Sequence, residues 1–234
     1  MLPRMGDWIE VPPMGRGWLA RPGVPGVPGV PGVLVLHAWW GLNGTFRSIV
    51  DRLAAEGFIA LAPDLYGGVV VDTIEDAQRM ADGLNEEEAS ELIRRSASRL
   101  ADEAGRTGHG IGVAGFSLGA FLALELAASR RVDPAVAAIV LVYGTGRSHD
   151  WSGLGAAVQG HFAADDPYES DEYVRALEAA FVEAGVSVEF LRYPGTGHWF
   201  MEPDRPDAYD AVKAEQAWAA LVGFLRRTLA PGPS

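Results

Sequence analysis

The sequence contains no cysteine and no apolar run long enough to span a membrane. The absence of cysteine excludes disulfide bonds and thiolate chemistry. The first eight residues include no apolar segment typical of a signal peptide, so we expect a cytoplasmic protein that does not associate with membranes. Basic residues are few, 19 Lys and Arg against 31 Asp and Glu, and the net charge of −12 disfavours nucleic acids and anionic membranes as partners.

The length and composition are those of one globular domain. The chain has 234 residues, of which 48% are hydrophobic and 21% charged. A Val-Pro-Gly repeat over residues 23–32 is too rich in Pro and Gly to form a helix or a central strand. We therefore expect residues 1–234 to form a single domain. Residues 1–32 would be its N-terminal edge segment, in which this Pro/Gly-rich connection joins an early hairpin to the first core strand.

After this segment, apolar runs alternate with amphipathic stretches. The apolar runs predict strands at Val33–His37, Phe58–Ala62, Ile111–Ala114, Ala135–Tyr143, Ala156–Phe162 and Val186–Tyr193. The amphipathic and Ala/Leu-rich stretches predict helices at Thr45–Glu56, Glu75–Ala81, Asn85–Glu103, 120–128, Ser170–Ala184 and Asp207–Leu229. This alternation is typical of the α/β class, with a mostly parallel sheet and helices on both faces.

One pentapeptide, Gly115-Phe116-Ser117-Leu118-Gly119, has the pattern G-x-S-x-G between an expected strand and an expected helix. The two glycines remove the side chains that would clash in such a sharp turn. The serine hydroxyl would then stand beside a helix N-terminus, which favours negative charge. This context indicates a nucleophile elbow rather than a chance match in a Gly-Ser loop.

A nucleophilic serine needs a histidine base and a carboxylate that orients the histidine. Of the five histidines, His37 and His109 precede the serine, which violates the order Ser, acid, His. His149 lies in a polar loop, and His161 lies inside a strand pattern that favours a structural role. His198 follows the last expected strand and is therefore the expected base.

The acid is less well determined by the residues alone. Asp165 and Asp166 both follow the strand that ends near Phe162, and periodicity does not choose between them. Asp150 follows the preceding strand and is a third candidate.

Two backbone amides should bind the oxyanion. We assign them to Leu118, directly after the nucleophile, and to Trp39, in the turn after the first core strand. Trp40, Trp199 and Phe200 are expected to wall an apolar substrate pocket.

Several of these stretches, in the same order, make the chain resemble the dienelactone hydrolase family of the α/β-hydrolases. They are 37–43 (HAWWGLN), 62–68 (APDLYGG), 115–119 (GFSLG), 160–166 (GHFAADD) and 193–200 (YPGTGHWF). The resemblance implies the α/β-hydrolase fold and places Tyr66 among the pocket residues. In the family's H-F-x-x-x-D pattern, the acid falls five residues after His161, which implies Asp166.

Three positions depart from the family's pattern. Ser117 replaces the cysteine nucleophile of the namesake enzymes, and Ala38 replaces a glutamate that interacts with the resting thiol. Glu202 stands where those enzymes place an arginine that holds the substrate carboxylate. We therefore expect Glu202 to line the pocket and to repel anionic substrates.

The resulting hypothesis is a serine hydrolase that cleaves neutral, hydrophobic carboxylic esters with a Ser117–His198–Asp166 triad. It needs neither metal nor cofactor and is a monomer or a homodimer. A thioesterase, a lactonase or an organophosphate triester hydrolase could use the same triad. A catalytically silent small-molecule receptor is the alternative from another class, although such proteins usually lose a member of the triad.

Overall fold

The strands and helices follow the expected alternation. The computed structural model describes residues 6–23, 29–105, 110–130, 133 and 135–230. The middle of the Val-Pro-Gly repeat, residues 24–28, and His109 lie outside the described residues, as do the two ends of the chain.

Within the described residues, eight strands form one sheet in the order β1-β2-β4-β3-β5-β6-β7-β8. Their bounds are β1 (Gly6–Val11), β2 (Gly15–Ala20), β3 (Gly32–Leu36), β4 (Ile59–Pro63), β5 (Ile111–Phe116), β6 (Val136–Val142), β7 (Ala157–Ala163) and β8 (Val188–Tyr193). The β1–β2 hairpin pairs antiparallel with β4, and the strands from β4 to β8 are parallel. The expected edge hairpin and mostly parallel sheet are confirmed.

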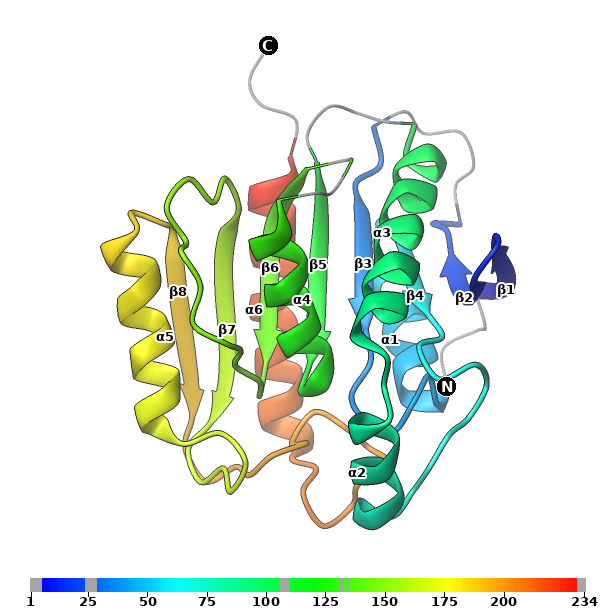
Figure 1. The fold of residues 1–234 in the computed structure, drawn as a ribbon. Helices are drawn as coiled ribbons and strands as arrows, with labels where there is room; N and C mark the ends of the chain where they lie inside the picture. The colour runs from blue at the N-terminus through cyan, green and yellow to red at the C-terminus, as the bar shows by residue number, and fades with distance from the viewer. Residues whose placement is uncertain (1–5, 24–28, 106–109, 131–132, 134, 231–234) are drawn as a thin grey trace.

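Helices cover both faces of the sheet. They are α1 (Gly44–Ala55), α2 (Ile74–Asp82), α3 (Glu86–Glu103), α4 (Leu118–Ser129), α5 (Asp171–Glu183) and α6 (Ala211–Leu229). Figure 1 shows α3, α4 and α5 in front of the sheet, with α1 and α6 behind it. No helix of the described residues is both long and apolar enough to cross a membrane.

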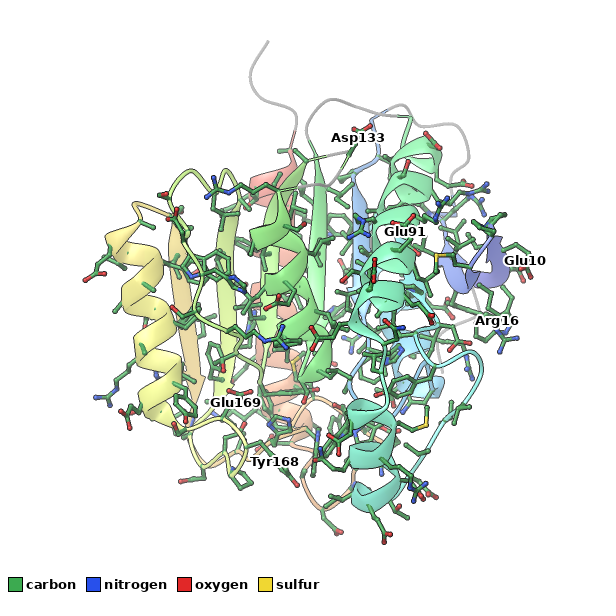
Figure 2. All side chains as sticks on the ribbon, viewed as in Figure 1. Glu10, Arg16, Glu91, Asp133, Tyr168 and Glu169 are labelled. Carbon is green, nitrogen blue, oxygen red and sulfur yellow. The ribbon has the colours of Figure 1, made fainter. Side chains whose placement is uncertain are left out.

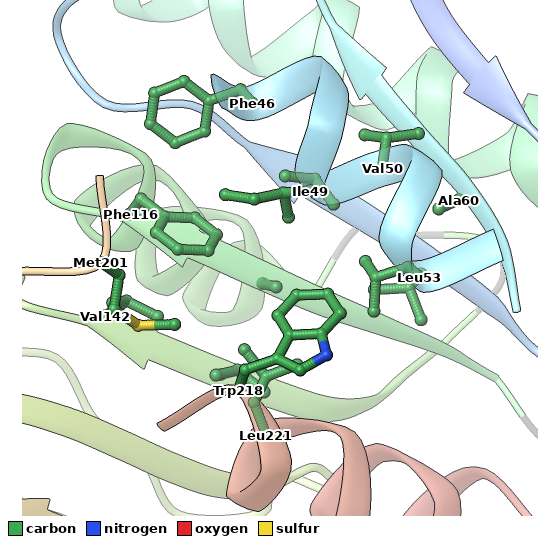
Figure 3. Packing of buried hydrophobic residues seen from close by; sticks show 14 of the residues in the cluster. Phe46, Ile49, Val50, Leu53, Ala60, Phe116, Val142, Met201, Trp218 and Leu221 are labelled. Atoms are coloured by element: carbon green, nitrogen blue, oxygen red, sulfur yellow. The ribbon is translucent and has the colours of Figure 1, made fainter. Parts of the chain in front are cut away.

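Each face of the sheet carries its own hydrophobic core. Behind the sheet, Phe46 and Leu53 of α1 and Trp218 of α6 pack with Phe116 of β5, as Figure 3 shows. Complete burial of one such side chain contributes about 1.5–3 kcal/mol, so the two cores fix the strands and hold their ends in place.

Helix starts follow local capping chemistry. The side chains of Asn43, Thr73, Asn85 and Ser170 each accept a hydrogen bond from the first turn of the helix that follows. The final helix differs from its prediction, because it begins at Ala211 and not at Asp207. Asp210 caps the amides of Val212 and Lys213, and the residues before it form turns.

The path of the chain creates a crevice at one edge of the sheet. From β3 the chain moves outward to β4 and then crosses back to β5 on the other side of β3. In parallel sheets, ligands bind outside the carboxyl ends of the strands at such a switch point. The turns after β3 and β5 therefore meet where a site is expected, at the lower edge of the sheet in Figure 1.

Candidate active site

The turn at Ser117 is as tight as its pattern suggests. A Cβ atom on Gly115 would overlap the carbonyl of Gly119, and one on Gly119 would overlap the carbonyl of Leu36. Ser117 has φ 51° and ψ −114°, and its hydroxyl does not cap α4 although it occupies the N-cap position. The strained backbone thus turns the hydroxyl away from the helix, where it is available for chemistry.

The Ser117 hydroxyl meets His198, and His198 meets Asp166. The Ser117 Oγ atom lies 2.9 Å from His198 Nε2. His198 Nδ1 lies 2.8 Å from Asp166 Oδ2 and 3.0 Å from Oδ1. Because the carboxylate only accepts, Nδ1 carries the proton and Nε2 is left to accept from the serine.

Backbone amides fix the position of the Asp166 carboxylate. Its Oδ1 accepts hydrogen bonds from the amides of Tyr168 (2.9 Å) and Glu169 (3.1 Å). The Asp166 side chain is only 2% exposed and that of His198 only 4%. The carboxylate is therefore fixed in one orientation toward the imidazole, and little water competes for it.

The other candidate acids and bases lie elsewhere. Asp165 is exposed and contributes its backbone amide to Thr196, while Asp150 caps the amide of Ser152. His149 binds Glu125 of α4. The His161 ring is saturated by Tyr193 and Gln159, and burial lowers its pKa to about 3, in keeping with the structural role expected for it.

The two expected oxyanion donors are placed at the same crevice. The carbonyls of Leu36 and His37 pass directly against Gly119, so the turn that follows β3 lies beside the start of α4. Leu118 is the first residue of α4, where amides have no partner inside the helix. Within the described part of the chain, neither the Leu118 nor the Trp39 amide donates to another backbone group.

An aromatic cleft opens beside His198. Its volume is about 560 Å³, and its lining includes Trp40, Tyr168, His198, Trp199 and Arg205; we call it the catalytic cleft. The Tyr168 ring lies 4.9 Å from that of His198 and 5.2 Å from that of Trp199, between ring centroids.

Tyr168 and its neighbour Glu169 were missed by the sequence analysis. Figure 2 shows both at the lower edge of the sheet. Glu169 accepts a hydrogen bond from Thr145, and burial raises its pKa. The sequence signal that could have indicated them is their position two and three residues after Asp166. Because Asp166 contacts His198, residues that follow it closely also lie near His198.

Phe200 and Glu202 do not line the pocket as expected, because both side chains have no exposed surface. Trp199, with φ 65°, turns the chain after His198, and Phe200 packs between Tyr143 and Tyr193 in the core. Glu202 accepts a 2.8 Å hydrogen bond from the Tyr143 hydroxyl, and burial raises its pKa to about 8. A buried and largely protonated carboxyl at neutral pH does not repel a substrate, so the charge argument made for Glu202 is wrong.

Tyr66 also lies apart from His198. It lines a second cavity of about 610 Å³, under the β1–β2 hairpin, with Arg16, Asp64, Met80 and Leu92; we call it the hairpin cavity. The Arg16 Nε atom pairs with Asp64 Oδ2 at 3.1 Å. The Tyr66 ring packs on His37, but its hydroxyl has no partner among the described residues.

One further side chain connects the loop of the base to the turn of the oxyanion donors. Asp204 accepts hydrogen bonds from Asn43 Nδ2 (2.8 Å) and Thr45 Oγ1 (2.6 Å), which flank the N-terminus of α1. A carboxylate is favoured there by the helix dipole. The loop that follows His198 is thereby attached to the segment that follows Trp39.

Across the described ranges, His, Asp and Glu side chains nowhere gather in a group of three that could hold a metal ion.

Comparisons with known proteins show which family the chain belongs to and which solved structures share its fold. A "putative carboxymethylenebutenolidase" of Aquifex aeolicus is 30% identical over 96% of this chain and 100% of its own. The crystal structure of a "putative dienelactone hydrolase" of Klebsiella pneumoniae has the same fold, with a TM-score of 0.83, 23% identity and coverage of 95% of this chain and 98% of that one. A dienelactone hydrolase-like promiscuous phosphotriesterase from metagenomic libraries is also similar in fold, with a TM-score of 0.78, 24% identity and coverage of 95% and 97%.

The model of the dienelactone hydrolase family matches residues 16–229, which include β2 apart from its first residue, the strands from β3 to β8 and the six helices of the described residues. The chain thus belongs to the dienelactone hydrolase family and is a hydrolase of the α/β-hydrolase fold that acts on esters or lactones.

Proposed function

We propose that this hydrolase cleaves neutral, hydrophobic carboxylic esters through an acyl-enzyme intermediate on Ser117. The observation that carries the proposal is the continuous line of hydrogen-bonding atoms from Ser117 Oγ through His198 to Asp166, with 2.9 Å at one end and 2.8 Å at the other. Nucleophile, base and orienting carboxylate are within the reach that proton transfer requires.

In the first half of the reaction, Ser117 Oγ attacks the ester carbonyl while its proton passes to His198 Nε2. The imidazolium formed is stabilised by Asp166, which keeps Nδ1 protonated. The tetrahedral oxyanion is bound by the amides of Leu118 and Trp39. Loss of one such donor typically costs about 10²–10³ in rate, so these amides supply a large part of the rate enhancement.

In the second half, His198 gives its proton to the leaving alcohol, and the acyl group remains on Ser117. Water then enters and is deprotonated by the same Nε2 atom. Its attack releases the carboxylic acid and restores the hydroxyl of Ser117.

The substrate class follows from the lining of the catalytic cleft. Tyr168 and Trp199 offer aromatic surface beside the base. The carboxylates of Asp72, Asp204 and Asp207 outnumber the guanidinium of Arg205 in the same lining. A neutral aryl or alkyl ester suits this cleft better than an ester with a free carboxylate near the scissile bond.

The test is labelling and turnover in one preparation. A fluorophosphonate probe should modify Ser117, as identified by peptide mass, and p-nitrophenyl esters should be hydrolysed with a burst of p-nitrophenol. Matched neutral and carboxylated esters should differ by about ten- to a hundredfold in kcat/KM, the effect of one close like charge in a partly dry site. A protein that is not labelled and does not turn over these esters would favour the receptor.

A lactone is the second candidate substrate, because the similar Aquifex aeolicus protein bears the name of a butenolide-opening enzyme. The same attack by Ser117 would open the ring and leave the alcohol tethered to the acyl group. Comparison of an aryl ester with a lactone of equal carbon number, in the native protein and in Ser117→Ala, separates the two candidates.

A further inference from the structure

Beneath His198 lies a buried pair of polar side chains that the reaction described above does not use. The Tyr143 ring packs 5.0 Å from that of His198, and Tyr143 has a strained φ of 37° where the chain leaves β6. Its hydroxyl donates to Glu202 Oε1 at 2.8 Å. Both side chains have no exposed surface, so this hydrogen bond supports the base from inside the core.

The second carboxyl oxygen of Glu202 lies near Trp40, which lines the catalytic cleft. Glu202 Oε2 and Trp40 Nε1 are both buried, and neither has a hydrogen-bond partner among the described residues. One is an acceptor and the other a donor, and Trp40 is near enough to lower the pKa of Glu202. A buried acceptor and a buried donor without partners destabilise the folded state. A hydrogen bond between the two would recover that free energy.

We propose that Glu202 is a positioning residue for this ester hydrolase, which holds Tyr143 under the base with Oε1 and binds the Trp40 indole of the cleft wall with Oε2. The proposal rests on the proposed function. It assigns the two ends of one carboxyl group to two steps: the Tyr143 end acts on proton transfer at His198, and the Trp40 end acts on substrate binding.

Charged neighbours decide when Oε2 can accept. Burial and the nearby carboxylate of Asp204 raise the pKa of Glu202 to about 8, while Tyr143, Arg205 and Trp40 oppose that shift. Below this pH the carboxyl is protonated and offers Trp40 a poorer acceptor. Above it, both oxygens accept, and the Arg205 guanidinium, 3.6 Å above the Trp40 ring, compensates the charge.

Three variants separate the two ends. At pH 9, where the native carboxyl is ionised, Glu202→Gln keeps an oxygen for Tyr143 but turns an amide donor toward the Trp40 donor, so KM for aryl esters should rise about three- to tenfold while kcat stays within about twofold. Tyr143→Phe should lower kcat by about three- to tenfold and leave KM unchanged. Tyr193→Phe is the matched control, because it also loses a buried tyrosine hydrogen bond, to His161, and should change neither.

The pH dependence supplies a readout that a merely structural role would not move. In the native protein, KM should fall between pH 7 and 9 as Glu202 ionises, and the indole N–H resonance of Trp40, assigned with Trp40→Phe, should move downfield over the same range. Glu202→Gln should abolish both changes.

Labelling of Ser117 by a fluorophosphonate is measured first in every variant. An unlabelled native protein would overturn the proposed function. A labelled Glu202→Gln variant with native KM and native pH dependence, or a Tyr143→Phe variant equal to Tyr193→Phe, would overturn the role of Glu202 and leave the proposed function intact.

Discussion

Two cavities of similar size lie among the described residues at different places in the fold, and of these two only the catalytic cleft adjoins the proposed triad. The hairpin cavity, at about 610 Å³, is slightly larger than the catalytic cleft, at about 560 Å³. Two of the charged residues in its lining, Arg16 and Asp64, form an ion pair with each other. In the cleft, His198 contacts the Ser117 hydroxyl on one side and, on the other, the Asp166 carboxylate, which accepts hydrogen bonds from backbone amides. The two cavities therefore differ in whether polar side chains meet at one point, and hardly in volume.

Backbone strain divides the two cavities in the same way. Ser117, Tyr143 and Trp199 all have positive φ values and all lie at or next to His198. None of the residues that line the hairpin cavity is a non-glycine residue with positive φ within the described chain. Strained conformations persist where the surrounding structure compensates for them, and here they aim three side chains at one point.

The sharpest way to break the comparison is to remove the nucleophile. Ser117→Ala should lower esterase kcat by about 10³-fold or more, because it removes the hydroxyl that meets His198 Nε2. The melting temperature should stay within a few degrees of the native value, measured by calorimetry. Residual activity near the native rate would mean that the reaction occurs elsewhere, with the hairpin cavity as the first place to look.

The next largest effect should come from the acid. Asp166→Asn should lower kcat by about 10²- to 10⁴-fold, because the amide would favour the wrong tautomer of His198. Asp165→Asn and Asp150→Asn are matched controls that should stay within about twofold of native, since neither side chain contacts the imidazole. Initial rates for the three variants decide. A crippled Asp150→Asn would contradict the assignment of Asp166.

A tyrosine from each cavity sharpens the comparison further. Tyr168→Ala removes a ring that contacts both His198 and Trp199, so KM for p-nitrophenyl esters should rise about three- to tenfold. Tyr66→Phe, in the hairpin cavity, loses only a hydroxyl that has no partner, so its kinetics should match those of the native enzyme. Equal effects of the two changes on KM would show that both cavities contact the substrate.

The last expected effect concerns stability and its dependence on pH, and we expect no change in the chemical step from it. The pKa of Glu202 is raised from 4.5 to about 8 in the folded protein, so the unfolded chain binds fewer protons at this site between these pH values. The contribution of Glu202 to the free energy of unfolding therefore falls as pH rises, by at most about 1.4 kcal/mol per pH unit. Relative to native, Glu202→Gln should gain stability from pH 5 to 8 and level off above, as measured by urea unfolding. A pH-independent difference would mean that Glu202 is already ionised at neutral pH.

Much of this site could be predicted from the sequence, because its parts are defined by chain order and short spacing. The glycines around Ser117 and the position of His198 after the last strand follow from the geometry of strand ends. The choice of Asp166 over Asp165 did not follow from periodicity. The two are adjacent in a loop, and a sequence pattern does not predict in which direction each loop side chain points. It came from the resemblance.

Glu202 shows why other parts could not be predicted. Its position, four residues after the base, says how far along the chain it lies but not which way it points. The positive φ of Trp199 redirects the backbone, so that Phe200 and Glu202 face the core instead of the cleft. A tryptophan in that conformation is rare enough that sequence patterns do not anticipate it. The direction of the Tyr66 side chain could not be predicted either. Tyr66 lies in a stretch that matches the family, but it lines the hairpin cavity.

The attachment of Asp204 to the start of α1 has a consequence for local unfolding. The loop that carries the base cannot swing away without releasing Asn43 and Thr45, and with them the carboxylate that stabilises the first turn of α1. Segments joined in this way open and close as one cooperative unit. A thermal fluctuation that displaces His198 therefore also loosens the turn that carries Trp39, so the proposed base and the proposed oxyanion donor would leave their positions together and return together.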